Sequence, residues 1–397
     1  MRSRVGKAAR ALAPLCIGVA TMLMLSAGTR ADVASDKAAA IIVFPKVVVD
    51  TSRPPKTSRG RVDTLIRVSN TSDRSIRMHC FYVNANGHCS NSPLTVCDPN
   101  TLATSLCGDG GVCRPDWVEI DFAVNLTPRQ PVAWLASQGS VACEDSADPD
   151  VPCFPLGGNV EGPNSNGGSR VSPVSEDPFV GELKCIAVDR NDVPVDQNVL
   201  KGEAEIIRSN PGFLDVEAYN AVGIAAMAGK VNSDNVLVLG GTAAEYNSCP
   251  NVLIMDHFFD GANDPISNRQ VTTDLTLVPC TEDFKTQTLV TTPVQFLVFN
   301  EFEQRFSTSR RITCFQEFRI SNIDSRTNDL SIFSAAVNGT LTGQTRIRGV
   351  ADDDQTHGHA LLGLAEEFRE GGGTTAVNLH FSGTRPQSDF IYLPGVQ

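Results

Sequence analysis

The sequence predicts an all-β protein in which one structural unit is used twice. Apolar segments of five to nine residues, rich in Val, Ile, Phe and Thr, recur between clusters of Asn, Asp, Gly and Pro. Several of them alternate, as in Val118, Ile120 and Phe122, whose side chains would share one face of a strand. Helical periodicity is weak. Residues 361–370 could form a short helix, but the repeat described next favours a strand there.

The duplication is indicated by similar segments that follow one another in the same order. IVFPKVVVD (42–50) corresponds to VLIMDHFFD (252–260), and the next matched aspartate lies 13 and 14 residues further on, respectively. Further pairs are residues 63–66 with 274–277, 80–84 with 296–300, 181–188 with 343–350, 200–205 with 361–367, and 218–220 with 376–378. Chance similarity between alternating strands is the competing explanation. The order and spacing favour two halves, 32–245 and 246–397, and the first half carries two loop insertions, 88–114 and 139–177.

The first 31 residues predict a Sec-type signal peptide. Arg2, Arg4, Lys7 and Arg10 precede an apolar stretch at 11–27, and a small residue, Ala31, ends the segment. An uncleaved signal anchor is the alternative. Cleavage would leave a periplasmic, cell-surface or extracellular protein with no stable membrane insertion.

The charge balance disfavours one class of partner. The chain has a formal net charge of −12, and residues 1–31 hold five cations and no anions, so export would change the charge to −17. Because an acidic protein is repelled by phosphate backbones, we expect no nucleic-acid partner.

Eleven cysteines remain after residue 31, and in an exported chain they predict disulfides. No CxxC pair is present, which argues against zinc. Cys80 and Cys185 lie in strand patterns and could bridge two strands, while Cys143 and Cys153 bracket a polar loop that they would close. The other candidates are Cys97, Cys107 and Cys113 in a Gly-rich loop, together with Cys280 and Cys314. An odd total leaves one thiol free or intermolecular.

Metal sites are weakly indicated, and no cofactor is expected. The best calcium candidates are four acidic residues in the loop between Cys143 and Cys153, namely Glu144, Asp145, Asp148 and Asp150. A second acidic cluster, 352–354, precedes His357 and His359; it could bind a divalent cation or form a solvated loop. His79 and His257 lie in strand patterns, where a core or cross-strand imidazole is the simpler interpretation.

The sequence predicts no catalytic residues, because HExxH, GxSxG, P-loop, GxGxxG and CxxCH motifs are all absent. Paired carboxylates of the glycosidase kind are the alternative, with Glu366 and Glu367, or Asp256 with Asp260, as candidates. Trp117 and Trp134 are interpreted as core or sheet-edge residues rather than as a platform for sugars.

The order of strands and turns in the first half is similar to a known class of module. Residues 63–77 hold a strand, the turn Asn-Thr-Ser-Asp and a second strand, and strands at 118–126, 131–135 and 181–188 follow. This order resembles the immunoglobulin-like β-sandwich modules of exported bacterial surface proteins. The resemblance implies two packed antiparallel sheets per module, and hence two duplicated antiparallel β-sandwich modules, the first with disulfide-rich loop insertions.

The function that follows is non-enzymatic. We expect an exported, disulfide-stabilised structural or binding protein whose protein or glycan partner contacts the loops of the first module. A secreted hydrolase that acts on polysaccharide, and a subunit of a surface appendage, are the alternatives.

Overall fold

The computed structural model describes residues 33–52, 55, 61–97, 107–108, 110–115, 117–139, 171–210, 213–325, 327–350 and 359–395. Residues 31–397 form one compact unit. The predicted signal peptide and most of the 139–177 insertion lie outside the described residues. Among the described residues, no helix is long and apolar enough to cross a membrane.

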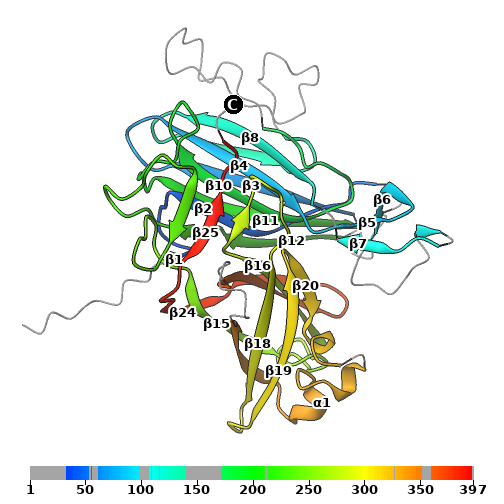
Figure 1. Ribbon diagram of the computed structural model, residues 1–397. Coiled ribbons are helices and arrows are strands. Elements are labelled where there is room, and N and C mark those ends of the chain that lie inside the picture. Colours follow the sequence, from blue (N-terminus) through cyan, green and yellow to red (C-terminus); the bar gives the residue numbers. More distant parts are fainter. Residues whose placement is uncertain are drawn as a thin grey trace, which may run out of the picture. The chain divides into compact units, whose positions relative to one another are not determined.

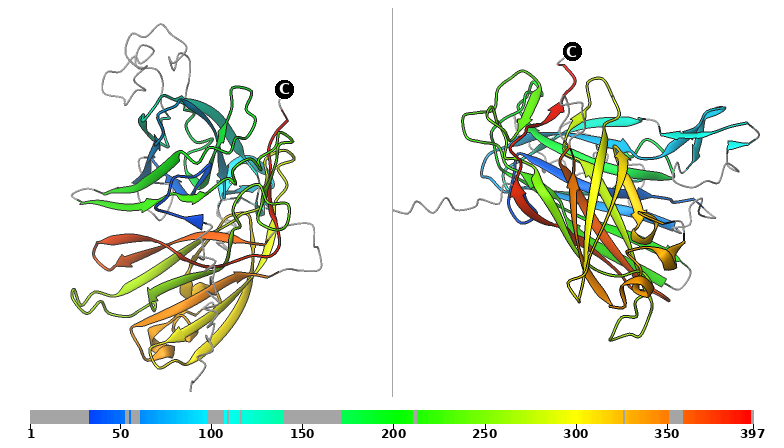
Figure 2. Two further views of the ribbon diagram at one scale, coloured as in Figure 1. Left: turned by 90° about the vertical axis from the view of Figure 1, so that its left-hand side faces the viewer. Right: turned by 60° about the horizontal axis from the view of Figure 1, so that its bottom comes forward.

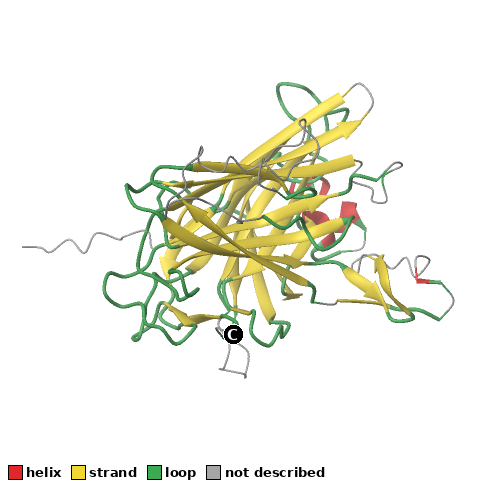
Figure 3. Cartoon of the chain, turned by 90° about the horizontal axis from the view of Figure 1, so that it is seen from above, coloured by secondary structure: helices red, strands yellow, loops and turns green. Residues whose placement is uncertain are grey.

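The described part of the chain is almost entirely β (Figure 3). Among the described residues, 57% lie in strands and 3% in helices. A six-stranded sheet has the order β1-β13-β2-β10-β4-β8. Its strands are β1 (Val33–Ala34), β2 (Ile41–Val49), β4 (Ile76–Asn84), β8 (Glu119–Leu126), β10 (Phe179–Val188) and β13 (Val222–Ile224). A four-stranded sheet, β12-β11-β3-β9, consists of β3 (Arg61–Asn70), β9 (Pro131–Leu135), β11 (Leu200–Asn210) and β12 (Phe213–Asn220).

The second half of the chain (residues 246–395) contributes two further large sheets (Figure 1). The five-stranded sheet, β19-β18-β21-β15-β24, holds β15 (Pro250–Phe258), β18 (Thr291–Asn300), β19 (Arg305–Thr313), β21 (Thr342–Gly349) and β24 (His380–Thr384). The four-stranded sheet, β20-β16-β22-β23, holds β16 (Val271–Pro279), β20 (Gln316–Arg319), β22 (Leu361–Arg369) and β23 (Thr374–Asn378). The strand expected in place of a helix at 361–370 is therefore confirmed.

Two three-stranded sheets and a few short helical turns complete the structure. One sheet, β14-β25-β17, joins β14 (Val236–Leu239), β17 (Glu282–Asp283) and β25 (Asp389–Tyr392). The other, β6-β5-β7, consists of β5 (Gly87–Cys89), β6 (Ser92–Cys97) and β7 (Cys113–Pro115) and belongs to the 88–114 insertion. The helical turns are η3 (Ile320–Asn322), η4 (Asn328–Leu330) and α1 (Ala335–Asn338).

Equivalent segments of the predicted repeat occupy equivalent places in the sheets. The order β13-β2-β10-β4-β8 is matched by β24-β15-β21-β18-β19, and β12-β11-β3-β9 is matched by β23-β22-β16-β20. Gly181 and Gly343 lie near the start of the equivalent strands β10 and β21 for a shared steric reason. A Cβ on Gly181 would lie 2.0 Å from the Val83 carbonyl oxygen, and one on Gly343 would lie 2.8 Å from the Phe299 carbonyl oxygen, so only glycine fits at either position.

The predicted fold class is nevertheless wrong, because the strands form a five-bladed β-propeller rather than two duplicated immunoglobulin-like sandwich modules. The sheet β14-β25-β17 combines strands from both halves. One hydrophobic core also includes residues of both halves, from Ile41 in β2 to Leu364 in β22 and Ile391 in β25. Strand alternation and turn residues indicate that a strand has a buried face, but they do not indicate which sheet covers that face.

Alternation is confirmed where a strand has one covered face. Residues of β3 alternate strictly between partly and fully buried, and Phe122, Val124 and Leu126 of β8 are buried on one side. In contrast, every residue of β2 and β10 is buried, because these central strands are covered on both faces. Trp134 is fully buried and its Nε1 donates to Tyr82 Oη at 2.7 Å, as expected for a core tryptophan.

Four disulfides join described cysteines. Cys80 and Cys185 are direct cross-strand partners on β4 and β10, with Cα atoms 4.0 Å apart. The 88–114 insertion contains Cys89–Cys107 and Cys97–Cys113, and Cys249–Cys280 joins the segments before β15 and after β16. Cys314 is a buried free thiol, so its prediction as a disulfide residue is wrong. Cys143 and Cys153 lie outside the described residues.

Candidate functional site

A pocket of about 500 Å³ opens where β15 and β18 end and β21 begins, beside β22. In the antiparallel register, Asp256 pairs with Gln344, and Asn300 pairs with Gly343. These residues therefore lie at the same end of three neighbouring strands in the five-stranded sheet. The lining is acidic and partly aromatic: it comprises Asp256, His257, Phe258, Phe299, Asn300, Glu301, Thr342, Gly343, Gln344 and Glu367.

The three carboxylates of the pocket have different environments. Asp256 accepts a hydrogen bond from Gln344 Nε2 at 3.1 Å. Glu301 accepts from the Thr342 hydroxyl and backbone N–H at 2.7 and 2.9 Å, and these bonds hold the pKa of Glu301 below its usual range. Burial raises the pKa of Glu367, although Glu367 also accepts a bond from the Phe258 N–H. The pocket therefore combines an exposed ionised acid with an acid that binds its proton more tightly.

His257 lines this pocket as a neutral imidazole. Its Nδ1 lies 2.9 Å from the Phe258 carbonyl oxygen, so Nδ1 donates, and Nε2 accepts from the Thr345 hydroxyl at 2.8 Å. Burial lowers the pKa of His257 to about 4, with smaller opposing effects from the Phe258 carbonyl and Asp256. The interpretation of His257 as a core imidazole agrees with these contacts.

Neither carboxylate pair suggested by the sequence faces a common cleft. Glu366 and Glu367 are neighbours on β22, so their side chains point to opposite faces of the sheet, and only Glu367 lines the pocket. Asp260 is buried and accepts from the Thr273 and Ser321 N–H groups at 2.8 and 3.1 Å, which is a structural role. The pocket instead contains one member of each pair, Asp256 and Glu367, and it adds Glu301, which the sequence did not single out.

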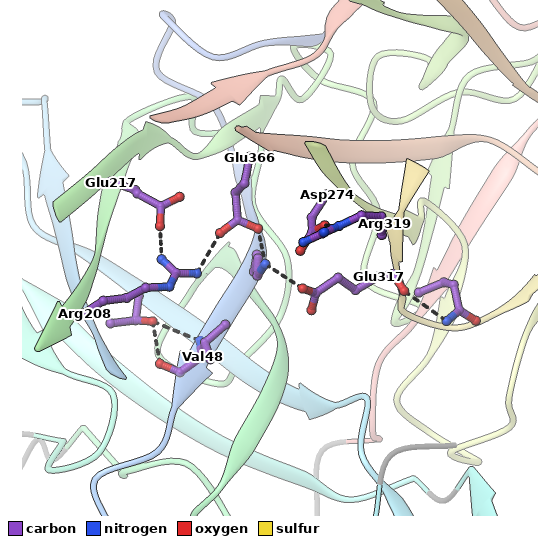
Figure 4. A network of polar contacts seen from close by, with 10 residues as sticks. Val48, Arg208, Glu217, Asp274, Glu317, Arg319 and Glu366 are labelled. Carbon is purple, nitrogen blue, oxygen red and sulfur yellow. Dashed lines mark hydrogen bonds and ion pairs between the residues drawn. The ribbon is translucent and has the colours of Figure 1, made fainter. Parts of the chain in front are cut away.

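A buried ion network lies on the other side of β22 (Figure 4). Lys46 of β2 contacts Glu366, and its Nζ lies 3.1 Å from Glu317 Oε1 of β20. Arg208 of β11 bridges Glu366, at 3.1 Å, and Glu217 of β12. Each cation of the first half thus meets a carboxylate of the second half at positions with little or no solvent exposure.

A second buried cluster surrounds Lys184 on β10. Its Nζ contacts Glu282 of β17 and lies 3.0 Å from Glu182 Oε2, and the three side chains are each 1% exposed. Burial lowers the pKa of Lys184, but the charges and hydrogen bonds of the two glutamates outweigh this effect and raise it. Burial and the charge of Glu182 raise the pKa of Glu282 well above its usual range, against the lowering effect of Lys184.

The two insertions of the first half meet at Glu176. Its Oε1 accepts from Asn84 Nδ2 at 2.9 Å and from Asn86 Nδ2 at 2.7 Å, and its Oε2 lies 2.9 Å from His88 Nε2. His88 belongs to the 88–114 insertion, and Glu176 belongs to the 139–177 insertion. The visible part of both insertions is therefore one connected feature beside the ends of β4 and β10.

The metal residues predicted from the sequence are almost all outside the described residues, so their prediction stands untested. Glu144, Asp145, Asp148 and Asp150 lie outside the described residues, as do the 352–354 cluster and His357. Cys89, Cys97 and Cys107 have sulfur atoms close to one another, but two disulfides engage all three. His79 makes a cross-strand contact, Nε2 to Asp121 Oδ2 at 2.8 Å, as expected for a structural imidazole.

No family model matches the chain, and no curated protein sequence matches it.

Proposed function

We propose that the protein is an exported, non-enzymatic structural or binding protein of the cell envelope or the extracellular space. The observation that supports this proposal is the set of four disulfides among the described cysteines. Disulfides form and persist in oxidising compartments such as the periplasm and the extracellular space. The signal-like segment at residues 1–31 agrees with export.

The 88–114 insertion is the proposed contact surface for a protein or glycan partner. Two disulfides cross-link the described residues of this insertion, and the contact of Glu176 Oε2 with His88 Nε2 at 2.9 Å connects it to the segment before β10. A rigid excursion on a stable β scaffold loses little conformational entropy when it binds a partner. The formal net charge of −12 disfavours nucleic acid as that partner.

The proposal is tested by binding to a glycan array and to isolated envelope material. In the test variant, residues 90–112 are replaced by a short Gly-Ser linker, with Cys89 and Cys113 changed to Ser. We expect loss of binding in this variant and retained binding in a control variant, Glu301→Gln, in the pocket. Equal binding by both variants would exclude the insertion as the contact surface, and cytosolic retention of the native chain would exclude export.

A secreted polysaccharide hydrolase is the second candidate, because Asp256 and Glu367 line the same pocket. A carboxyl group with a raised pKa can act as the general acid of glycoside cleavage, and an ionised partner can act as base or nucleophile. Turnover of any member of a broad glycan panel, abolished by Glu367→Gln and by Asp256→Asn, would establish this function in place of the first. No turnover by the wild-type protein is expected.

A further inference from the structure

The two faces of the five-stranded sheet, β19-β18-β21-β15-β24, differ in chemistry. Val294, Phe296 and Ile347 are buried in the hydrophobic core of the second half. Since successive side chains of a strand point to opposite faces, their neighbours lie on the outer face, and there Arg346 and Arg348 of β21 are exposed. Figure 2 shows the strands of this sheet, with β15 green, β18 and β19 yellow and β21 orange. Because β21 is the middle strand, the two arginines lie near the centre of the outer face.

The strand register places further side chains on this outer face. Arg346 pairs with Leu297, and Arg348 pairs with Gln295, on β18. On the edge strand β19, the exposed residues that share the face are Arg305, Ser307, Ser309 and Arg311. We define the arginine face as the outer surface of this sheet, which carries Arg305, Arg311, Arg346 and Arg348.

The charge of this sheet is opposite in sign to that of the whole chain. Its five strands contain five arginines and one acid, Asp256. The chain as a whole has a formal net charge of −12. Asp256 and Glu301 lie at the end of the sheet that forms the pocket. The acids at 352–354 follow β21 and lie outside the described residues.

The arginines of the arginine face have no counter-ion within the described residues. Arg346 Nε donates to Gln344 Oε1 at 3.5 Å, which is a weak contact with a neutral group. Arg310, the remaining arginine of the sheet, is held by the fold. Its guanidinium lies 5.0 Å from the centre of the Phe318 ring and donates to the Asn322 carbonyl oxygen at 2.6 Å. The charges of the arginine face are therefore available to an anion from outside the chain.

The spacing of these charges fits a linear ligand. Outward-facing residues two apart on a strand, such as Arg346 and Arg348, are separated by about 7 Å. Arg305 and Arg311, six residues apart on β19, are separated by about 20 Å along the strand. One small anion can contact two neighbouring arginines but cannot span this distance. An array of this length is matched by a chain that carries a negative charge at regular intervals.

We propose that the arginine face binds a linear polysaccharide whose sugars carry carboxylates. The planar guanidinium group pairs with a carboxylate through two parallel hydrogen bonds. Between the arginines, Gln295, Ser307 and Ser309 present amide and hydroxyl groups that can bond to sugar hydroxyls. This inference goes beyond the proposed function, because it names a second contact surface, separate from the 88–114 insertion.

The net charge of the molecule favours a single thin chain over an extended anionic surface. Exposed charges act over about 10 Å in dilute salt, so a polysaccharide chain on the arginine face responds mainly to the arginines. A membrane or a nucleic-acid duplex also meets the surrounding acidic surface, which repels it.

The experiment measures binding of the purified full-length protein to immobilised polygalacturonate at low ionic strength. EDTA is present, so that no divalent cation joins the polymer to acidic residues. The matched control ligand is fully methyl-esterified polygalacturonate, which has the same sugar chain without its charges. We expect the protein to bind the acid polymer, to bind it less tightly as sodium chloride is added, and to ignore the ester. Absence of binding to the acid polymer, or equal binding to both polymers, would overturn the proposal. Tighter binding to phosphatidylglycerol vesicles or to single-stranded DNA would also overturn it.

Two double variants with the same change of charge locate the site. The test variant is Arg346→Gln with Arg348→Gln, and the control variant is Arg74→Gln with Arg190→Gln, two exposed arginines of the first half. Since bonds to charged groups are lost, we expect affinity for polygalacturonate to fall at least about tenfold in the test variant and to change little in the control. Equal losses in both variants would assign binding to net charge and contradict the proposal. Arg311→Gln, on β19, should weaken binding independently, and an unchanged melting temperature checks that each variant is folded.

The variant that lacks residues 90–112 separates this inference from the proposed function. We expect it to bind polygalacturonate as the wild type does. If that variant loses polygalacturonate binding while Arg346→Gln with Arg348→Gln retains it, the arginine face is excluded and the insertion remains the contact surface. If the insertion variant keeps all binding to envelope material, the insertion is excluded, and the polygalacturonate result still decides the role of the arginine face.

Discussion

Lys46 on β2 and Glu366 on β22 form an ion pair in which neither side chain is exposed to solvent, although 320 residues separate them in the sequence. Glu366 also binds Arg208, so one carboxylate contacts two buried cations. Removing this carboxylate would leave Lys46 with Glu317 alone and Arg208 with Glu217 alone, in a medium that solvates charge poorly.

We therefore predict that Glu366→Ala lowers the free energy of unfolding by about 3–5 kcal/mol. The matched control is Glu203→Ala, because Glu203 pairs with Arg67 at a site where the side chains are 52% and 40% exposed. An exposed pair contributes about 0–1 kcal/mol. Urea unfolding of both variants measures the difference, and equal losses would contradict the importance of burial.

We predict that His257 makes a contribution to the free energy of unfolding that is lost in acid. Burial lowers its pKa from 6.5 to about 4. Above pH 6.5 both folded and unfolded states hold a neutral imidazole, so the contribution is complete there. As the pH falls toward 4, the unfolded state binds a proton that the folded state does not bind, and about 2–3 kcal/mol is lost.

The measurement is the free energy of unfolding between pH 7 and pH 4.5. We expect His257→Gln to lose less stability over this range than the wild type, and the exposed His380→Gln to follow the wild type. Parallel curves for His257→Gln and the wild type would contradict the prediction.

We predict that the contribution of Glu119 to stability has the opposite pH dependence, because it is lost as the pH rises. Burial raises the pKa of Glu119 to about 7, with Asp121 and Asp283 adding to the effect and a hydrogen bond from Trp117 opposing it. A raised folded pKa stabilises the protein fully below the ordinary value of 4.5, and the contribution is lost as the pH rises through about 7. Glu119→Gln should therefore gain melting temperature relative to the wild type between pH 5 and pH 8. The exposed Glu203→Gln should show no such gain.

Cys314 should be chemically inert in the folded protein. Its side chain is 5% exposed, and burial, followed by the charge of Glu282, raises the pKa of its thiol to about 12. Because the thiolate is the reactive form, iodoacetamide should not label Cys314 under native conditions and should label it in denaturant. Rapid labelling of the native protein, located by peptide mapping, would contradict its burial.

The sequence was informative about strands and much less so about how they pack. Alternation placed Phe122 on a buried face, and the spacing of segments matched Gly181 with Gly343, which share a steric reason for being glycine. These signals are local, and local signals cannot identify the sheet that covers a given face. The fold class failed for that reason.

In the candidate site, too, the sequence indicates the local strand but not the contacts between strands. Consecutive side chains of a strand point to opposite faces, so Glu366 and Glu367 of β22 cannot face one another across a cleft. The sequence predicts a strand at this segment, and that strand already conflicts with the proposed carboxylate pair. The meeting of Asp256 with Glu367, and of Lys46 with Glu366, depends on contacts between strands far apart in the sequence. No motif or spacing in a single sequence reports such contacts.

The distribution of buried charge between the two halves limits which substitutions of a whole half the fold can accept. Lys46, Lys184 and Arg208 come from the first half, and Glu366, Glu317 and Glu282 come from the second half. Each of these three cations therefore has at least one counter-ion in the other half. A half-chain exchange would therefore keep these buried charges paired only if the incoming half carried acids at the matching places.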